Sequence, residues 1–186
     1  MKEKIKHLIG YIRLCLFHIR APQKKGIYLG KNLNVVGGKN IKVEPYVCIR
    51  PGCDLWASGK IKIGLGTEIG KNCRISIKNE LIIGRDVLFS PNVYITDCDH
   101  EYRDINRPVM KQGVVAQNNT IEIGDGSFIG INSVLVGNIR IGKHCIIGAN
   151  AVVTTDIEDY CVATGVPARV IKTYNRENCK WEIVKN

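Results

Sequence analysis

The first part of the chain has apolar residues at the spacing of an amphipathic helix. Between residues 2 and 20 the apolar positions are Ile5, Leu8, Ile9, Ile12, Leu16 and Ile19, and basic positions on the other side are Lys2, Lys6, Arg13 and Arg20. Apolar residues three and four apart share one helix face, so we predict a helix that ends at Ala21-Pro22. Leu14 and Phe17 widen its apolar face. That face either packs on the body of the protein or another subunit, or lies on an anionic membrane surface.

Beyond residue 26 a six-residue period replaces the helical one. Ile-Gly pairs begin at residues 63, 69, 83, 123, 129, 141 and 147, in units such as IGDGSF, IGINSV, IGKHCI and IGANAV. Repeats at a fixed period predict stacked coils, in which each unit buries its apolar side against its neighbours. Three units make one triangular coil, so residues 123–140 and 141–158 are expected to form two successive coils. The body of the chain is therefore predicted to be an all-β parallel solenoid.

Each six-residue unit also predicts how the chain turns a corner. Gly is frequent at the second position and Asn or Asp at the fourth, and these residue types give the backbone freedom at corners. The fifth position holds a small or aliphatic residue that fits inside the corner. Cys53, Cys73 and Cys145 all occupy it, so we interpret them as packing residues rather than reactive thiols.

One interruption of the pattern is a candidate for chemistry. The six-residue units continue through ITDCDH and then fail from Glu101 to Thr120, which predicts an inserted loop over residues 101–120. Long loops on a rigid scaffold often carry function. His100 lies at the start of this loop, and imidazole is the usual general base near neutral pH. Flanking carboxylates can orient such an imidazole. His100 is therefore the candidate base, whereas His7, His18 and His144 are expected to be surface residues.

Composition and charge exclude several classes of protein. The 186 residues include 27 Lys and Arg against 17 Asp and Glu, a net charge of +10, and +6 of this belongs to residues 1–25. The remaining charge is scattered and not interleaved with aromatic residues, which argues against a nucleic-acid-binding protein. No apolar run reaches the length of a membrane span. The eight cysteines form no Cys-x-x-Cys pair, so we expect no metal site and a reducing, cytoplasmic setting.

Two motifs within residues 27–172 make the chain resemble the hexapeptide-repeat acyltransferases. The first is SPNVYITDCDH, which resembles the segment that leads to that family's catalytic histidine and ends here at His100. The second is GVPARVI at residues 165–171, which resembles the signature at the end of the family's repeats. The resemblance implies a left-handed parallel β-helix, although the general rule for parallel crossovers favours the right-handed form. It is closest to the branch that acetylates sugars and polysaccharides, related to the maltose, galactoside and xenobiotic acetyltransferases.

The resemblance also implies a donor, an assembly and a set of binding residues. The donor would be acetyl-CoA, held in a groove between two subunits of a homotrimer. Carried over by position, the residues that hold it are Gly130, Ile131, Ala149, Thr154, Thr155, Arg169 and Lys172. Arg169 and Lys172 would meet the CoA phosphates, where cations are required. The chain departs from the family's pattern at Cys98, Phe128 and Ile131.

We therefore expect three segments and one leading function. Residues 1–25 would form the basic helical arm, residues 26–172 the acyltransferase β-helix, and residues 173–186 a cap or tail. The leading hypothesis is an acetyl-CoA-dependent O-acetyltransferase that acts on a sugar in cell-surface polysaccharide biosynthesis. It would work in the cytoplasm, either free or held peripherally on the inner face of the membrane through residues 2–20. The alternatives are N-acetylation of a nucleotide-linked amino sugar, acetylation of an antibiotic, a gamma-type carbonic anhydrase, and a non-enzymatic solenoid.

Overall fold

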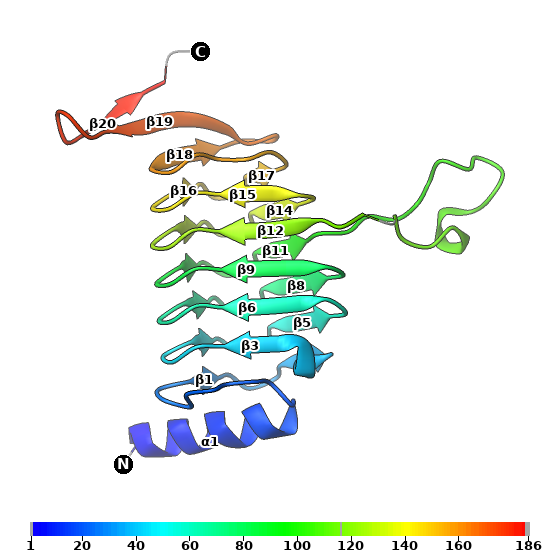
Figure 1. The fold of residues 1–186 in the computed structure, drawn as a ribbon, viewed down its shortest axis with the longest axis vertical. Coiled ribbons are helices and arrows are strands. Elements are labelled where there is room, and N and C mark those ends of the chain that lie inside the picture. Colours follow the sequence, from blue (N-terminus) through cyan, green and yellow to red (C-terminus); the bar gives the residue numbers. More distant parts are fainter. Residues whose placement is uncertain (1, 116, 185–186) are drawn as a thin grey trace.

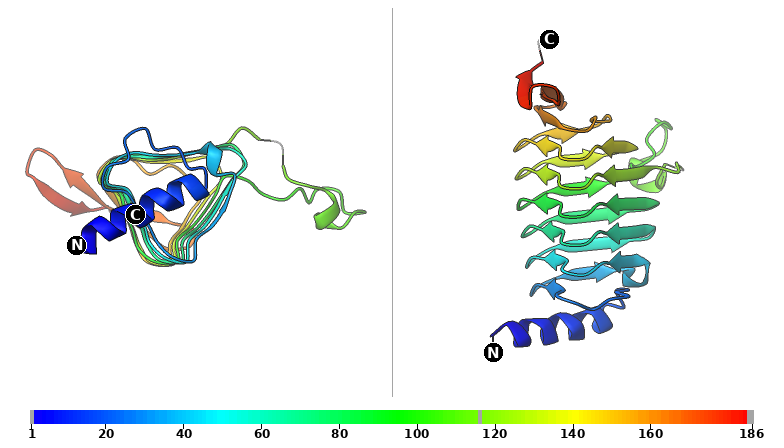
Figure 2. Two further views of the ribbon diagram at one scale, coloured as in Figure 1. Left: turned by 90° about the horizontal axis from the view of Figure 1, so that it is seen from below. Right: turned by 60° about the vertical axis from the view of Figure 1, so that its left-hand side comes forward.

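The computed structural model describes residues 2–115 and 117–184, with side chains from residue 8 onward, and has the shape of a triangular prism (Figure 1). Helix α1 (Lys2–Leu16) lies across the N-terminal end of a stack of parallel coils. Seen along the stack, the coils superimpose as a triangle, from which the inserted loop projects on one side and the C-terminal strands on the other (Figure 2). The predicted left-handed parallel β-helix is confirmed.

Three sheets form the sides of the prism within the described residues. The nine-stranded sheet contains β1 (Tyr28–Leu29), β4 (Cys48–Ile49), β7 (Glu68–Ile69), β10 (Leu88–Phe89), β13 (Phe128–Ile129), β16 (Ile146–Ile147), β18 (Cys161–Thr164), β19 (Arg169–Asn175) and β20 (Lys180–Ile183). The six-stranded sheet contains β2 (Asn34–Val36), β5 (Asp54–Ala57), β8 (Arg74–Ile77), β11 (Tyr94–Thr96), β14 (Val134–Val136) and β17 (Val152–Val153). The five-stranded sheet contains β3 (Ile41–Val43), β6 (Lys60–Ile63), β9 (Glu80–Ile83), β12 (Thr120–Ile123) and β15 (Ile139–Ile141). Two short 3-10 turns, Gly38–Asn40 and Val109–Lys111, complete the elements.

The coils become shorter along the prism. Ile63 pairs with Ile83, whereas Ile123 pairs with Ile141, so the early coil is two residues longer than the later one. The first predicted coil, 123–140, is confirmed by this pairing. The second is two residues shorter than predicted, because Ile141 pairs with Ile157. The longer early coils arise because β5 and β6 have four residues each where β14 and β15 have three.

The corners explain the residue types of the six-residue unit. Eight of the fourth positions have φ between 50° and 72°: Gly66, Asn72, Asp86, Asn92, Gly126, Asn132, His144 and Asn150. Asn and Gly are the residues that adopt this left-handed conformation most readily. The second-position glycines have a different role from the one expected. At Gly130 the backbone is not left-handed, but an added Cβ would lie 2.6 Å from the backbone nitrogen of Ala149 in the next coil.

The small fifth positions point into the prism, as predicted. Cys53, Cys73 and Cys145 are buried, and their thiols donate hydrogen bonds to carbonyl oxygens of a neighbouring coil, at 3.0 Å to Gly70, 3.3 Å to Ser90 and 2.9 Å to Glu158. Burial raises the pKa of the Cys145 thiol. These three cysteines are packing residues.

Helix α1 is shorter than predicted and packs through an unexpected face. It ends at Leu16 rather than Arg20, because His18 adopts a left-handed conformation (φ 55°) and the N–H of Ile19 turns back to the carbonyl of Leu14 at 2.9 Å. Ile19 is buried beyond the helix. Leu14 is buried, whereas the described part of the predicted apolar stripe within the helix is exposed. The predicted side-chain positions that lie outside the described residues are Lys2, Ile5, Lys6 and His7.

Two predicted boundaries fall inside strands. Thr120 is the first residue of β12 and pairs with Glu80, so the inserted loop ends one residue earlier than predicted, at Asn119. The expected start of the cap at residue 173 lies within β19, which pairs with β18 on one side and β20 on the other as an antiparallel extension of the nine-stranded sheet.

Candidate active site

Most of the predicted site residues flank the upper part of the six-stranded sheet. Ile131 and Ala149 lie at the corners that lead into β14 and β17. Thr154 and Thr155 follow β17, at the side of the sheet where its strands end. His100 lies at that same side, four residues beyond β11. All five side chains are exposed. Residues that are far apart in the sequence are thus brought to one sheet, some where its strands begin and some where its strands end.

The register places His100 and the two threonines at the side where the strands end, in different coils of the prism. Ile95 pairs with Leu135, and Leu135 pairs with Val153, so β11 and β17 are two coils apart. Adjacent strands are separated by about 4.8 Å, so Thr154 lies about 10 Å along the prism axis from the end of β11. A donor that extends along this side could contact several of the predicted residues at once.

The GVPARVI signature folds over the end of the same sheet. The N–H of Val152 donates to Gly165 O at 3.0 Å, and the N–H of Ala168 donates to Val152 O at 2.8 Å. These two bonds attach the signature to the last strand of the six-stranded sheet and bring Arg169 next to it. Arg169 is exposed, with one guanidinium N–H donated to Ala168 O at 2.9 Å. Arg169 and Lys172 both belong to β19 of the nine-stranded sheet, where Arg169 pairs with Thr164 and Lys172 with Val162. Lys172 is therefore further along β19 from the contact with Val152.

His100 is held in the base of the inserted loop, which we call the loop neck (residues 99–101 and 113–115). His100 bridges antiparallel to Val114, the N–H of Glu101 donates to Gly113 O at 3.0 Å, and the N–H of Val115 donates to Asp99 O at 2.9 Å. Beyond the neck the loop projects far from the prism (Figure 1). The neck therefore fixes the backbone of His100 while leaving its side chain exposed.

The flanking carboxylates act differently from what the sequence indicated. Asp97 is fully buried and accepts three backbone N–H groups of the coil below, from Lys78 at 2.7 Å, Asn79 at 2.6 Å and Glu80 at 3.2 Å. Asp99 accepts the N–H of His100 itself at 2.9 Å. These hydrogen bonds orient the chain that carries His100, and no hydrogen bond to its imidazole is found among the described residues.

Further contacts attach both ends of the loop to the prism. Asn119 donates its side-chain amide to Asp97 O at 2.7 Å, and Lys78 donates its ammonium to Val115 O at 3.2 Å. Cys98 is half-buried, and its carbonyl accepts the hydroxyl of Thr96 at 3.2 Å. The sequence alone did not distinguish Asp97 as the anchor, since Asp99 has the same residue type two positions later.

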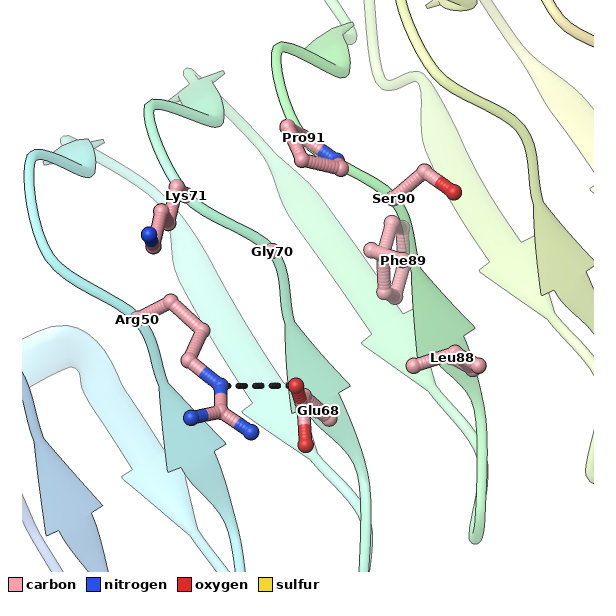
Figure 3. Close-up of a pocket in the computed structure, with 8 residues that line it drawn as sticks. All are labelled: Arg50, Glu68, Gly70, Lys71, Leu88, Phe89, Ser90 and Pro91. Carbon is pink, nitrogen blue, oxygen red and sulfur yellow. Dashed lines mark hydrogen bonds and ion pairs between the residues drawn. The ribbon is translucent and has the colours of Figure 1, made fainter.

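A shallow pocket of about 390 Å³ lies elsewhere, at the corner that follows the nine-stranded sheet (Figure 3). It is lined by Arg50, Glu68, Gly70, Lys71, Leu88, Phe89, Ser90 and Pro91. Arg50 and Glu68 face each other across it at 2.7 Å and neutralise one another. None of the predicted site residues lines this pocket.

Three structural facts bear on other functions. Within residues 2–115 and 117–184, no group of three or more His, Cys, Asp or Glu side chains lies close enough together to hold a metal ion. His144 lies on a different corner from His100, where its ring stacks on Tyr160 with centroids 5.6 Å apart. Among the helices that the structure describes, none has the length and apolar character needed to cross a membrane.

Comparison with known proteins assigns the family. Residues 120–155 match the family model described as bacterial transferase hexapeptide (six repeats). The chain is 31% identical over 134 residues to the candidate lipopolysaccharide biosynthesis O-acetyl transferase WbbJ of Escherichia coli, with 69% of this chain and 68% of WbbJ covered. It is 30% identical over 183 residues to a probable acetyltransferase of Mycobacterium tuberculosis, with 95% of this chain covered, and it spans 59% of that relative's length.

A solved structure gives the same answer for the fold. The N-acyltransferase AntD from Bacillus cereus, in complex with dTDP and 3-hydroxybutyryl-CoA, superimposes with a TM-score of 0.74 over 90% of both chains at 19% identity. Repeat frame, inserted loop, terminal signature and relatives therefore agree, and the chain belongs to the hexapeptide-repeat acyltransferases.

Proposed function

We propose that the protein transfers an acetyl group from acetyl-CoA to a hydroxyl group of a sugar, in the synthesis of a cell-surface polysaccharide. The observation that carries this proposal is that His100, Thr154, Thr155, Ile131 and Ala149 flank one sheet of an acyltransferase β-helix. The relative WbbJ, which is named as a lipopolysaccharide biosynthesis O-acetyl transferase, supports the choice of acceptor.

The donor would lie across the upper part of the six-stranded sheet. Gly130 lets two coils approach closely at the corner before β14, where Ile131 and Ala149 are exposed. Thr154 and Thr155 are exposed at the corner on the opposite side of the sheet. The guanidinium of Arg169 lies at the end of this sheet, where it would meet the phosphates of CoA. Lys172 lies three residues further along β19 and would reach only a phosphate that extends over the corner. The groove would be completed by a neighbouring subunit of a homotrimer, which would cover part of these exposed side chains.

In the proposed reaction His100 acts as a general base. Its imidazole takes the proton of the acceptor hydroxyl as the oxygen attacks the thioester carbonyl of acetyl-CoA. The tetrahedral intermediate then collapses, the C–S bond breaks, and the CoA thiolate receives the proton from the imidazolium. The inserted loop beyond the neck would contact the acceptor. The buried thiols of Cys53, Cys73 and Cys145 suit the reducing cytoplasm in which we place this reaction.

The test compares two histidines changed in the same way. We expect His100→Asn to lower kcat by about 10²–10⁴, measured as release of free thiol from acetyl-CoA with sugar acceptors. His144→Asn is the matched control, because His144 is also exposed and Asn adopts its left-handed backbone readily. Equal turnover by both variants would refute the role of His100. Turnover only with amino-sugar nucleotides would instead identify an N-acetyltransferase.

A further inference from the structure

Helix α1 attaches to the β-helix through one narrow face. Gly10 and Leu14 are buried there, and Leu14 is only 3% exposed. A Cβ at Gly10 would lie 2.5 Å from Ile27 O, so the helix backbone touches the first coil directly. Arg13 adds a hydrogen bond from its guanidinium to Leu29 O. These contacts fix the rotation of α1 about its own axis, and so decide which of its side chains face away from the coils.

The opposite face of α1 is apolar and uncovered by the described chain. Leu8 is 59% exposed, Ile12 54% and Leu16 69%, and Ile9 is also exposed. We call these four residues the outer stripe. Ile12 follows Gly10 by two residues and so lies about 200° around the helix axis from it. Because α1 lies across the N-terminal end of the prism (Figure 2), the outer stripe points away from the coils.

The segment that carries the outer stripe is strongly basic. Residues 1–25 carry Lys2, Lys4, Lys6, Arg13, Arg20, Lys24 and Lys25 against Glu3 alone, a net charge of +6. The ammonium of Lys24 lies 4.6 Å from the ring centroid of Tyr11, another exposed residue of the helix. An apolar helix face with basic residues around it is the arrangement that binds at the boundary between lipid headgroups and acyl chains.

We propose that α1 docks the protein on an anionic phospholipid surface, with the outer stripe buried at the headgroup boundary and the basic residues against the lipid phosphates. Charge decides between this occupant and a second copy of the chain. Two outer stripes packed together would bring two +6 segments into contact, whereas anionic lipid neutralises them. Docked in this way, the prism would stand on the surface with the coil of β11 three strand spacings, about 14 Å, beyond that of β2.

Flotation with lipid vesicles tests the docking without any turnover. We expect the full chain to bind vesicles of equal parts phosphatidylglycerol and phosphatidylcholine, and to bind phosphatidylcholine alone roughly tenfold more weakly, because the charge term is lost. The triple variant Leu8→Ser, Ile12→Ser and Leu16→Ser should weaken binding to the anionic vesicles by roughly tenfold or more, since its apolar contact is removed. Lys24→Gln should weaken it about fivefold.

The matched control is Ile183→Ser in β20 at the other end of the prism, where the side chain is 75% exposed. This variant should bind as the parent does. A single-tryptophan probe, Ile12→Trp with the chain's own tryptophans replaced as Trp56→Phe and Trp181→Phe, should be quenched by brominated lipid. This quenching reports contact even if the triple variant folds poorly. Thiol release with a water-soluble acceptor should be the same in the triple variant and the parent, so a failure of the proposed acetyl transfer would not be mistaken for a failure to dock.

Three outcomes would overturn the proposal. The first is no binding of the parent to anionic vesicles, and the second is equal binding by the triple variant. The third is that the chain does not bind lipid and that sedimentation shows an oligomer of the parent which dissociates in the triple variant. That result would make the outer stripe an interface between copies of the chain.

Discussion

The anchoring of the inserted loop by Asp97 gives a prediction whose size follows from the structure. Asp97→Asn keeps the shape of the side chain but replaces one of its two acceptor oxygens with an NH₂ group. The buried carboxylate accepts N–H groups from Lys78, Asn79 and Glu80. In the variant at least one of these donors would face another donor.

The magnitude comes from the hydrogen bonds that are lost or weakened. A hydrogen bond to a charged group contributes about 1.5–3 kcal/mol, and a buried donor without an acceptor costs about 1–3 kcal/mol. We expect Asp97→Asn to lower the free energy of unfolding by about 2–4 kcal/mol. For a chain of this length that corresponds to a fall in Tm of about 4–16 °C.

Thermal unfolding at one fixed protein concentration measures this effect, since the stability of an oligomer depends on concentration. Asp99→Asn is the control, because Asp99 is exposed and accepts only the N–H of its neighbour His100. That variant should melt within about 2 °C of the parent. A Tm for Asp97→Asn that matches the Tm of Asp99→Asn would show that the buried carboxylate does not anchor the loop.

Three further outcomes are expected. Gly130→Ala should lower Tm by about 2–12 °C, because its Cβ would press on the backbone nitrogen of Ala149 and overpacking costs about 1–3 kcal/mol; an unchanged melting curve would contradict the close contact. In labelling with a disulfide reagent, exposed Cys179 should react in the native protein, whereas Cys145, whose pKa is raised by burial, should react only after unfolding. Arg169→Ala should raise KM for acetyl-CoA about tenfold or more with little change in kcat; an unchanged KM would remove Arg169 from the donor site.

The repeat made most of the fold predictable, because the residue types within each six-residue unit favour one local backbone geometry. An aliphatic residue, a residue suited to a left-handed corner and a small inward residue recur together, and the backbone at Asn132 and Asn150 adopts the conformation their residue type favours. The coil length was less predictable. The segment from Arg74 to Ile83 has no clear six-residue unit, so the added length of the early coils became visible only from strand pairing.

The orientation of α1 could not be read from its apolar pattern. An amphipathic pattern identifies the apolar face of a helix, but it does not say whether that face meets the protein. The signal that would have indicated the packed face is Gly10, because Gly is costly within a helix and often marks close backbone contact. In the structure Gly10 and Leu14 form that face. Similarly, nothing in the sequence separated buried Asp97 from exposed Asp99.

The register across the inserted loop has a consequence for how such enzymes diversify. Ile83 pairs directly with Ile123, just as Ile63 pairs with Ile83 one coil earlier, so the chain between paired positions is twice as long across the loop. Doubling the length of a closed loop costs only about 0.6 kcal/mol. Because the ladders continue undisturbed on both sides, a further doubling would cost about as little. Natural selection can therefore change the length of this loop as freely as its sequence, while the scaffold that holds His100 stays the same. In the proposed function, where the loop contacts the acceptor, such changes would bring new acceptors.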